Sequence, residues 1–295
     1  MKKKEVFRGA ATALITPFLD GEIDYKALGE LIEYQISGGI DALVIGGTTA
    51  EAATLSDDER YKLYTFAKGK VSGRTKLIFG TGTNDTRVAI KHTRFAERLG
   101  CDGVLLVTPY YNKGTEEGIE KHYLSIAESA DLPIILYNVP SRTGVNLGIN
   151  LLGRLSNHPN IVALKEASDS TDRMVNLSVF GDKLRLYAGN DSQIYPALSL
   201  GGAGVISVVS NILPKTTVML CRSYFEGSQS EALRLQLLLL PFIKSLFMET
   251  NPAPIKFAMS ERGFCTSEVR LPLSEPREST KKEILKRLEE LSDLR

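Results

Sequence analysis

One lysine stands where its amine could act as a nucleophile. Lys165 ends the apolar run Asn160–Lys165, and Glu166-Ala167-Ser168 follows at once. Such a run is typical of a strand buried on both faces, and the carboxyl ends of such strands carry the chemistry of α/β folds. An amine held in an apolar pocket loses its proton more readily and can attack a carbonyl carbon. The competing interpretation is a lysine that ends a strand and reaches water, and position alone favours it.

Polar groups at the ends of other predicted strands suit the same chemistry. Tyr137 can carry protons while a carbinolamine forms and breaks, and the hydroxyls of Thr48 and Tyr111 can complete a relay with it. The turn Gly47-Thr48-Thr49 exposes backbone N–H groups that suit a carboxylate. Arg142 offers a planar fork for a second carboxylate. With the lysine, these groups predict Schiff-base chemistry on a 2-oxo acid.

Each of these groups also has a purely structural interpretation. Tyr110-Tyr111 suits an aromatic interface, Gly46-Gly47 suits tight packing, and Arg142 suits a surface ion pair. The stretch Tyr137–Pro140 suits a strand that ends in a turn. The functional interpretation therefore rests on the occurrence of all of them together, at six strand ends.

Eight apolar runs of strand length alternate with helical patterns along the 295 residues. This alternation indicates a parallel sheet, and eight such units closing on themselves form a (β/α)8, or TIM, barrel, whose carboxyl strand ends meet at one mouth. A doubly wound open sheet is the alternative, but neither a dinucleotide-binding nor a P-loop motif is present. The predicted strands are Ala11–Thr16, Ala42–Gly46, Leu77–Thr81, Gly103–Thr108, Ile134–Asn138, Ile161–Lys165, Leu184–Ala188 and Gly204–Val208.

Capping residues mark several helices. Ser56 and Glu59 form a capping box, Asp85 precedes a helix that Gly100 ends, and Thr115 precedes another through Ser129. We assign residues 1–226 to the barrel and residues 227–295 to a small C-terminal helical region. No linker rich in Gly, Pro or Ser separates the two, so we expect this region to pack on the barrel. The helices predicted after the last strand are Leu213–Glu226, Ser230–Phe247, Pro254–Glu261 and Ser279–Leu294.

The composition is that of an ordinary soluble globular protein, with 43% hydrophobic and 24% charged residues. The formal net charge of +1 suggests no nucleic-acid partner. The basic start Met1–Lys4 is expected to be a solvated tail, and no apolar segment follows it as in a secretory signal. The longest apolar stretch, Leu237–Phe242, is far too short for a membrane helix.

The cysteines and histidines predict neither a disulfide framework nor a metal site. The three cysteines are widely scattered, which fits a reducing cytoplasm. The three histidines stand among polar residues without zinc-ligand spacing. They are Cys101, Cys221, Cys265, His92, His122 and His158.

The chain resembles the dihydrodipicolinate synthase family, one of the pyruvate-dependent aldolases that include N-acetylneuraminate lyase. The similarity runs from Gly9 to Pro272 and is most specific at Thr108–Asn112, Tyr137–Gly144, Lys165–Ala167 and Asn251-Pro252. The whole group shares the Gly-Thr-Thr turn, the tyrosine and the lysine. The Ser-Arg-Thr-Gly within Tyr137–Gly144 points to the synthase.

The resemblance implies a role for each candidate residue. Lys165 forms a Schiff base with pyruvate, and Thr48, Tyr137 and Tyr111 relay protons, with Tyr111 acting in the site of a neighbouring subunit. Thr48 and Thr49 supply backbone donors to the pyruvate carboxylate.

The resemblance also implies a second substrate and a biological setting. Arg142 is similar to the residue that holds the carboxylate of L-aspartate-4-semialdehyde, and Ile206 to the one whose carbonyl lies near the lysine. The family uses no metal or organic cofactor. It works in the cytoplasm on the diaminopimelate route to lysine, usually as a homotetramer built as a dimer of dimers.

Two departures from the family pattern affect these expectations. Ala50 stands where the family commonly has glycine, and would be strained at a positive φ, although we expect the turn to survive. Members inhibited by lysine share a serine, histidines and a glutamate in an interface pocket. Asn84 and Tyr110 of that pocket remain, but its other matching positions are changed, which predicts weak or absent inhibition by lysine. They are Ala52, Asp57, Arg60 and Val88.

Three rival hypotheses stay open at this point. A sister aldolase would cleave a sugar acid such as N-acetylneuraminate or 2-keto-3-deoxygluconate, which has no second carboxylate for Arg142. A non-catalytic ligand sensor would form no pyruvate adduct on Lys165. A phosphate-binding isomerase would use the loop Gly201–Gly204 and would need a carboxylate base at a strand end.

Overall fold

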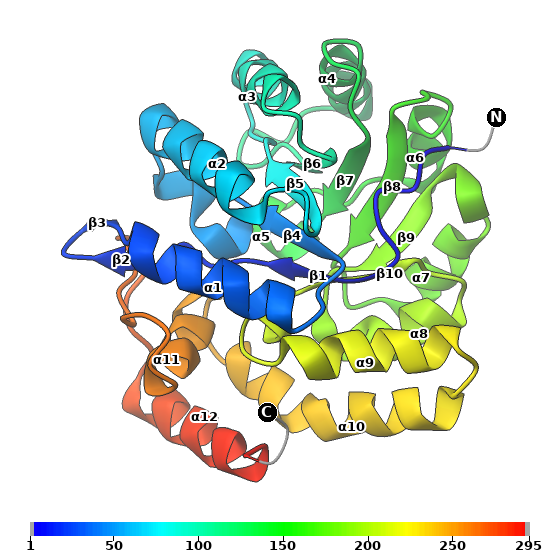
Figure 1. Ribbon diagram of the computed structural model, residues 1–295. Coiled ribbons are helices and arrows are strands. Elements are labelled where there is room, and N and C mark those ends of the chain that lie inside the picture. The colour runs from blue at the N-terminus through cyan, green and yellow to red at the C-terminus, as the bar shows by residue number, and fades with distance from the viewer. Residues whose placement is uncertain (1–2, 293–295) are drawn as a thin grey trace.

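The computed structural model describes residues 3–292. Within them, eight parallel strands close into a barrel surrounded by helices (Figure 1), which confirms the predicted TIM barrel. Strand neighbours follow chain order, and the last strand pairs with the first. The barrel strands are β1 (Gly9–Ala13), β4 (Ala42–Ile45), β5 (Lys76–Gly80), β6 (Gly103–Val107), β7 (Ile134–Asn138), β8 (Ile161–Glu166), β9 (Arg185–Ala188) and β10 (Gly204–Ser207).

The predicted strands agree with these bounds except at the start of the chain. β1 begins and ends earlier than predicted, whereas the other strands agree to within one residue at each end. After β1, the short strands β2 (Phe18–Leu19) and β3 (Glu22–Ile23) form a hairpin that the sequence patterns did not predict.

The barrel strands separate two apolar cores. On β7, Ile135 and Tyr137 belong to the cluster that fills the barrel interior, whereas Ile134 and Leu136 belong to the larger cluster between strands and helices. This is the alternation that a pleated strand imposes on its side chains. The interior is therefore a packed core, and Tyr137 is its last inward side chain on this strand.

The pairing between β7 and β8 shifts by one residue near the start of β8. Ile134 pairs with Ile161 but Ile135 pairs with Ala163, so one residue of β8 is extra at this point. That residue, Val162, and Ala163 both belong to the interior cluster. A strict alternation from Ile161 would have pointed Lys165 outward, because one residue of slip reverses every side chain. The extra residue turns the lysine into the barrel.

The helices begin where the capping residues predict. Ser56 and Glu59 form a complete capping box, and Asp24, Asp85 and Thr115 each accept a hydrogen bond from the first turn of their helix. Four short helices, α5 to α8, were not predicted. The barrel helices are α1 (Tyr25–Ser37), α2 (Asp57–Val71), α3 (Thr86–Arg98), α4 (Glu116–Ala127), α5 (Pro140–Thr143), α6 (Ile149–Leu155), α7 (Thr171–Ser178), α8 (Ile194–Ser199) and α9 (Pro214–Phe225). Short 3-10 turns are η1 (Thr48–Ala50), η2 (Ala52–Thr54), η3 (Gly181–Lys183), η4 (Asp191–Gln193) and η5 (Val209–Asn211).

Three more helices follow the barrel. They are α10 (Gln229–Leu246), α11 (Ala253–Glu261) and α12 (Glu278–Glu290). Helix α10 lies along α9, and α12 contacts both α10 and α11 (Figure 1). The division of the chain at residue 226 stays a prediction, and residues 293–294 of the last predicted helix lie outside the described residues.

The start of the chain differs from the solvated tail that we predicted. The Lys3 ammonium donates to the carbonyl oxygens of Ser156 at 2.6 Å and His158 at 3.0 Å, and also to that of Ile161. Residues 1–2 of the basic stretch lie outside the described residues. Lys3 thus ties the chain to the amino end of β8, because these carbonyl groups converge there and suit an ammonium donor.

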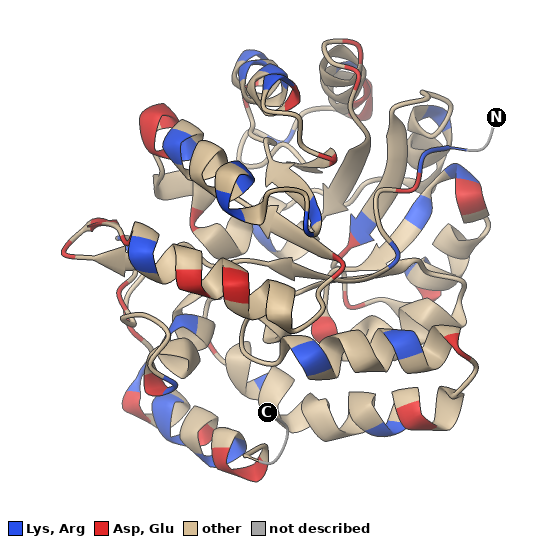
Figure 2. Ribbon diagram, viewed as in Figure 1, with Lys and Arg blue, Asp and Glu red and all other residues tan. Residues whose placement is uncertain are grey.

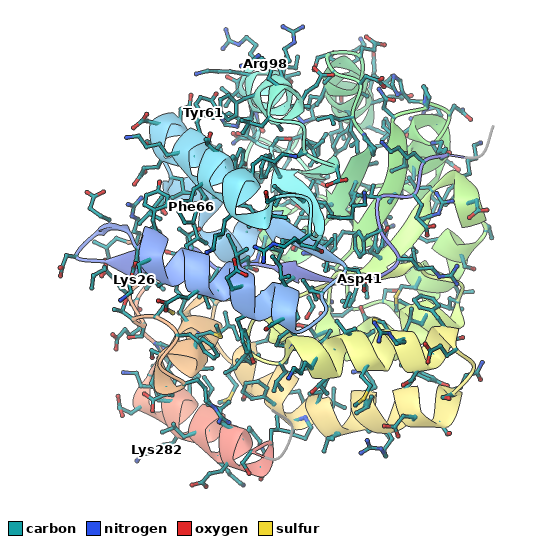
Figure 3. All side chains as sticks on the ribbon, in the orientation of Figure 1. Lys26, Asp41, Tyr61, Phe66, Arg98 and Lys282 are labelled. Atoms are coloured by element: carbon teal, nitrogen blue, oxygen red, sulfur yellow. The ribbon has the colours of Figure 1, made fainter. Side chains whose placement is uncertain are left out.

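Charged side chains of both signs cover the outer helices. Figure 2 shows acidic and basic residues mixed along α2 and α12. Lys26, Arg98 and Lys282 lie at the periphery in Figure 3, and all three are exposed. Across residues 3–292, no helix combines the length and the apolar character needed to cross a membrane.

A buried ion pair joins the turn after β4 to the C-terminal helices. The ammonium of Lys256 lies 2.5 Å from Oε1 of Glu51, and both side chains are almost completely buried. Lys256 also donates to the carbonyl of Glu268 at 2.7 Å, and the other carboxylate oxygen of Glu51 accepts from the N–H of Arg270 at 2.9 Å. The pair is therefore fully hydrogen-bonded at both ends, as a buried pair needs to be.

Replacing Lys256 with methionine should lower the free energy of unfolding by about 3–5 kcal/mol, because the Glu51 carboxylate would stay buried without its counter-charge. Lys62→Met is the control, since the ion pair of Lys62 with Asp58 is exposed at both ends and should matter little. Chemical denaturation followed by circular dichroism measures both. Equal denaturation midpoints for the two variants would contradict the prediction.

Candidate active site

Lys165 and Tyr137 face each other at the carboxyl end of the barrel. They are partners in the register between β7 and β8, and the Lys165 ammonium nitrogen lies 4.3 Å from the centre of the Tyr137 ring. Lys165 is only 4% exposed and Tyr137 only 6%. The structure therefore contradicts the alternative of a lysine that escapes to water.

The surroundings of both side chains favour their neutral forms. Burial lowers the pKa of Lys165 to about 8, with the charge of Asp191 opposing this shift and that of Arg142 adding to it. Burial also raises the pKa of Tyr137, while Arg142 and the nearby Thr48 hydroxyl offset part of that rise. About a tenth of the amine is therefore neutral at pH 7, far more than for an exposed lysine, beside a phenol that keeps its proton.

The turn after β4 forms as predicted. The N–H of Ala50 donates to the carbonyl of Gly47 at 3.1 Å, and the N–H of Glu51 to that of Thr48 at 3.0 Å. Positive φ angles fall on Gly46 (69°) and Glu51 (55°), whereas Ala50 lies inside η1 without one. Alanine is therefore compatible with the turn. The N–H groups of Thr48 and Thr49 stand in the first turn of η1, where a helix offers them no acceptor of its own.

Asn251 connects this turn to Arg142. Its side-chain amide donates to the hydroxyl of Thr49 at 3.0 Å, and its backbone carbonyl accepts from a terminal nitrogen of Arg142 at 2.9 Å. Arg142 lies on α5, directly after β7, and is exposed at the barrel mouth. The two groups predicted to hold carboxylates are thus fixed relative to each other by one residue from beyond the barrel.

The carboxylate next to Lys165 in the sequence, that of Glu166, makes its contacts outside the cavity. Glu166 accepts from Arg173 at 2.9 Å, from the side chain of Asn138 at 2.9 Å and from the N–H of Ser168 at 2.8 Å. Its charge is neutralised by Arg173, which lies on α7 outside the strands. Alternation along β8 therefore separates the lysine from this buried acid.

Two cavities meet at Tyr137 and Arg142. One, of about 350 Å³, is lined by Lys165, Tyr137, Thr48, Thr49, Arg142, Asp191 and Asn251 among others. The second, of about 480 Å³, shares Thr48, Tyr137, Arg142 and Asn251 with it. The structure thus brings together five of the predicted site residues around one hollow large enough for a small acid.

The other two predicted residues lie apart. Tyr111 is 88% exposed, has a φ of 75°, and lies outside the walls of both cavities. Ile206 is fully buried in the barrel interior on β10, paired with Ala11 of β1.

Sequence reasoning gave no role to Asp191 or Asn251. Asp191 follows β9 and is 1% exposed on the wall of the lysine cavity. Its position at a strand end was the available signal for it. Asn251 lies between α10 and α11, away from any strand end. The rule that functional residues follow barrel strands therefore could not predict its position.

The loop Gly201–Gly204 does not serve this site. It precedes β10, and so lies at the amino end of the strands rather than at the mouth. Its N–H groups at residues 201 to 203 donate to the carbonyl oxygens of Leu198, Ala197 and Leu186. Because these donors are already used, the loop is not available as a phosphate-binding nest.

Comparison with known proteins agrees with this geometry. Residues 6–291 match the sequence profile of the dihydrodipicolinate synthetase family. The chain belongs to this family. It is 46% identical over 275 residues to a protein of Clostridium novyi (strain NT) named 4-hydroxy-tetrahydrodipicolinate synthase, an alignment that covers 93% of each chain.

Solved structures of family members superpose closely. The dihydrodipicolinate synthase of Acinetobacter baumannii, described as chloride-inhibited and complexed with pyruvate, is 39% identical with a TM-score of 0.94, covering 97% of this chain and 99% of that one. A structure described as the first monomeric dihydrodipicolinate synthase variant is 42% identical with a TM-score of 0.95, covering 97% of each chain. Family membership therefore does not by itself determine the number of subunits.

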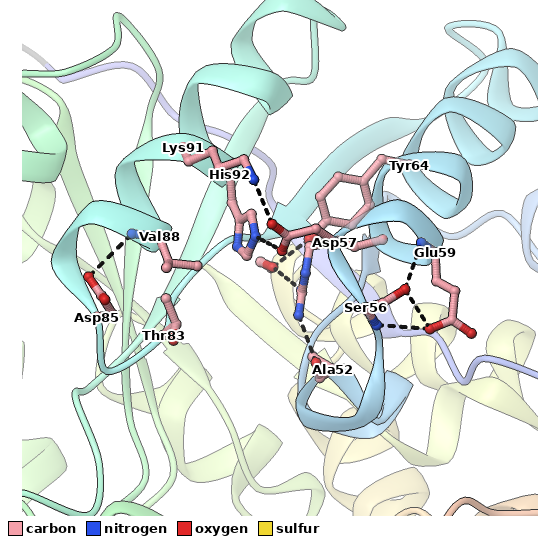
Figure 4. Close-up of polar contacts among 12 residues, drawn as sticks. Ala52, Ser56, Asp57, Glu59, Tyr64, Thr83, Asp85, Val88, Lys91 and His92 are labelled. Atoms are coloured by element: carbon pink, nitrogen blue, oxygen red, sulfur yellow. Dashed lines mark hydrogen bonds and ion pairs between the residues drawn. The ribbon is translucent and has the colours of Figure 1, made fainter.

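The four positions on which the predicted weak response to lysine rests all line the larger of these two cavities. The carboxylate of Asp57 lies 2.7 Å from the ammonium of Lys91 and 2.8 Å from Nε2 of His92 (Figure 4). A guanidinium nitrogen of Arg60 donates to the carbonyl of Ala52 at 2.7 Å. The fourth position, Val88, is apolar.

These contacts bear on the predicted response to lysine. Arg60 is 8% exposed and places a positive charge against the cavity wall, which disfavours an ammonium ligand there. Val88 offers no carboxylate to an α-amino group. Weak or absent inhibition by lysine stays a prediction.

Lys165 should react with trace acetic anhydride in proportion to its neutral fraction, reaching half its maximal reactivity near pH 8, because burial lowers its pKa to about 8. Lys62 is the control, since its hydrogen bond to Asp58 raises its pKa. Its reactivity should still be rising where that of Lys165 has levelled off. Peptide mass mapping measures both residues in one sample. Coincident pH profiles would contradict the assignment.

Proposed function

We propose that this protein is a 4-hydroxy-tetrahydrodipicolinate synthase, a lyase that condenses pyruvate with L-aspartate-4-semialdehyde on the route to lysine. The observation that carries the proposal is the buried Lys165 amine with its lowered pKa, facing Tyr137 in a cavity at the barrel mouth. The relative from Clostridium novyi bears this name, and the Acinetobacter baumannii structure holds pyruvate. Both support the choice of substrates.

The reaction begins with pyruvate on Lys165. The neutral amine attacks the keto carbon, and the resulting carbinolamine loses water to give a Schiff base. Tyr137 keeps its proton because burial raises its pKa, so it can protonate the departing hydroxyl, with Thr48 adjoining it in a relay. The N–H groups of Thr48 and Thr49 hold the pyruvate carboxylate, and the carbonyl of Ile206, a buried residue of β10, is proposed to lie near the lysine.

The second substrate then enters beside Arg142. Tyr137, left as a phenolate after it protonates the departing hydroxyl, takes a methyl proton and converts the Schiff base into an enamine. The enamine attacks the aldehyde carbon while the guanidinium holds the substrate carboxylate, and Tyr137 returns the proton to the new alkoxide oxygen. The amino group of the adduct attacks the imine carbon, closes the ring and releases Lys165. These steps use only side chains and backbone groups of the protein, so the proposal invokes neither a metal nor an organic cofactor.

The active form is proposed to be a cytoplasmic homotetramer built as a dimer of dimers. Tyr111 supports a shared site, because an aromatic side chain 88% exposed beside the mouth of one barrel is placed to reach a neighbouring copy. In that arrangement Tyr111 completes the proton relay of the neighbouring site.

Treating the protein with pyruvate and cyanoborohydride should reduce the imine and leave pyruvate attached to Lys165, seen as a mass gain on the peptide that contains this residue.

Tyr137→Phe should lower kcat by about 10²–10⁴-fold, because the proton carrier is lost. Tyr187→Phe is the control, since this buried phenol pairs with Lys165 in register on β9 but donates to the carbonyl of Phe7. An unmodified Lys165, or equal kcat for the two variants, would refute the mechanism.

Arg142→Leu should raise KM for L-aspartate-4-semialdehyde about tenfold or more and change KM for pyruvate little, because only the second substrate loses its ionic partner. Arg154→Leu on α6, whose partners are the surface acids Glu116 and Glu120, is the control. Steady-state assays varying each substrate measure the effect. Faster turnover of N-acetylneuraminate or 2-keto-3-deoxygluconate by the unmodified protein would favour the sugar-acid aldolase instead.

A further inference from the structure

A protonated Schiff base places a positive charge in a dry cavity, and this inference rests on the proposed function. The nitrogen of Lys165 is neutral when it attacks and cationic once the imine is protonated. An ion without a partner in such surroundings is strongly disfavoured. The cavity therefore needs a negative charge that the neutral amine does not require.

The cavity wall offers two carboxylates, and only one is buried. Asp169 is exposed at the rim, whereas Asp191 is 1% exposed. Glu166 is buried nearby but already neutralised by Arg173 at 2.9 Å. The charged or titratable side chains on the wall are Tyr137, Arg142, Lys165, Asp169, Asp191 and Lys244, the last of them exposed.

Two backbone hydrogen bonds hold one carboxylate oxygen of Asp191. Its Oδ2 accepts from the N–H groups of Val208 and Val209, both at 2.9 Å, where the chain leaves β10. Its own backbone carbonyl accepts from the side chain of Gln236 at 3.1 Å. Within the part of the chain that the structure describes, Oδ1 has no hydrogen-bond partner.

A buried oxygen without a partner is rare in folded proteins and calls for an explanation. The two N–H groups need only one acceptor atom, which a neutral side chain such as asparagine also supplies. A structural role alone therefore accounts for Oδ2 but not for the negative charge or for Oδ1.

We propose that Asp191 is the counter-ion of the protonated Schiff base on Lys165. The amine attacks the keto carbon, the hydroxyl of the carbinolamine leaves as water, and the positive charge stays on nitrogen while Asp191 keeps its negative charge and takes no proton. The imine carbon then remains electrophilic, and the methyl proton is lost more readily. In the free protein the same carboxylate already acts on the lysine, because its charge opposes the fall in the pKa of Lys165. Burial raises the pKa of Asp191 itself, whereas the Ser207 hydroxyl, the two backbone N–H groups and the charge of Lys165 oppose that rise. A cation on the lysine nitrogen therefore favours the ionised carboxylate.

The test compares pH profiles of pyruvate trapping on Lys165 by cyanoborohydride for the unmodified protein and Asp191→Asn. Loss of the carboxylate lowers the pKa of both the amine and the imine. The rising and falling limbs of the profile should therefore both move to lower pH, by about one pH unit or more. Asp169→Asn, which removes the exposed carboxylate of the same cavity, should leave both limbs in place.

A lower yield with unmoved limbs in Asp191→Asn would overturn the proposal and indicate a structural role. Failure of the unmodified protein to trap pyruvate would instead refute the proposed function. Circular dichroism shows whether the variant folds.

A second measurement needs no variant. With lysine labelled by ¹⁵N, the nitrogen shift of the imine formed with pyruvate reports its protonation across pH. The reference is the pyruvate imine of Nα-acetyl-lysine in water. The imine of the unmodified protein should stay protonated at least to the pH at which this reference loses its proton, because the counter-ion offsets the lowering of the imine pKa by burial. Deprotonation well below that pH would overturn the proposal even if Asp191→Asn did not fold.

Discussion

The one-residue shift in the pairing of β7 with β8 is the constraint on which the site depends. It places Val162 as an extra residue, so Ala163 and then Lys165 point into the barrel. Without it the lysine would face the helices and Glu166 would face the interior, since successive side chains on a strand alternate. The same shift brings Lys165 level with Tyr137. A feature of backbone pairing therefore decides which of two adjacent charged residues faces the cavity at the barrel mouth.

Once the lysine is inside, its reactivity follows from opposing effects on its charge. Burial lowers the pKa of the amine, Arg142 lowers it further, and Asp191 limits the fall. The same burial keeps Tyr137 protonated. Burial thus favours a neutral amine and a protonated phenol side by side, and in the proposed mechanism the carboxylate of Asp191 offsets the charge of the imine. A drier cavity without Asp191 would favour attack but would disfavour the protonated imine that attack produces.

The sequence sufficed for the barrel because its signals are local. Apolar runs and capping residues such as Ser56 and Asp85 mark the elements, and eight repeats allow few other arrangements. It also placed Lys165, Tyr137 and Arg142 at strand ends. It could not reveal the extra residue in β8, because both faces of that strand are apolar. Without an alternation of polar and apolar residues, the sequence does not show which side chains point into the barrel. Lys3 was misjudged because its acceptors, the carbonyl groups near residues 156 to 161, are distant in sequence.

The C-terminal region contacts the candidate site directly. Asn251 bonds both Thr49 and Arg142, and Lys256 neutralises Glu51 directly after the turn that carries the two threonines. Glu51 holds a left-handed backbone conformation, which a neighbouring structure must stabilise. A barrel truncated after α9 would keep the lysine and the tyrosine but would lose Asn251, which joins Thr49 to Arg142. The strands therefore close the barrel, whereas the relative placement of the two groups proposed to bind carboxylates depends on the C-terminal region, which no strand pattern predicts.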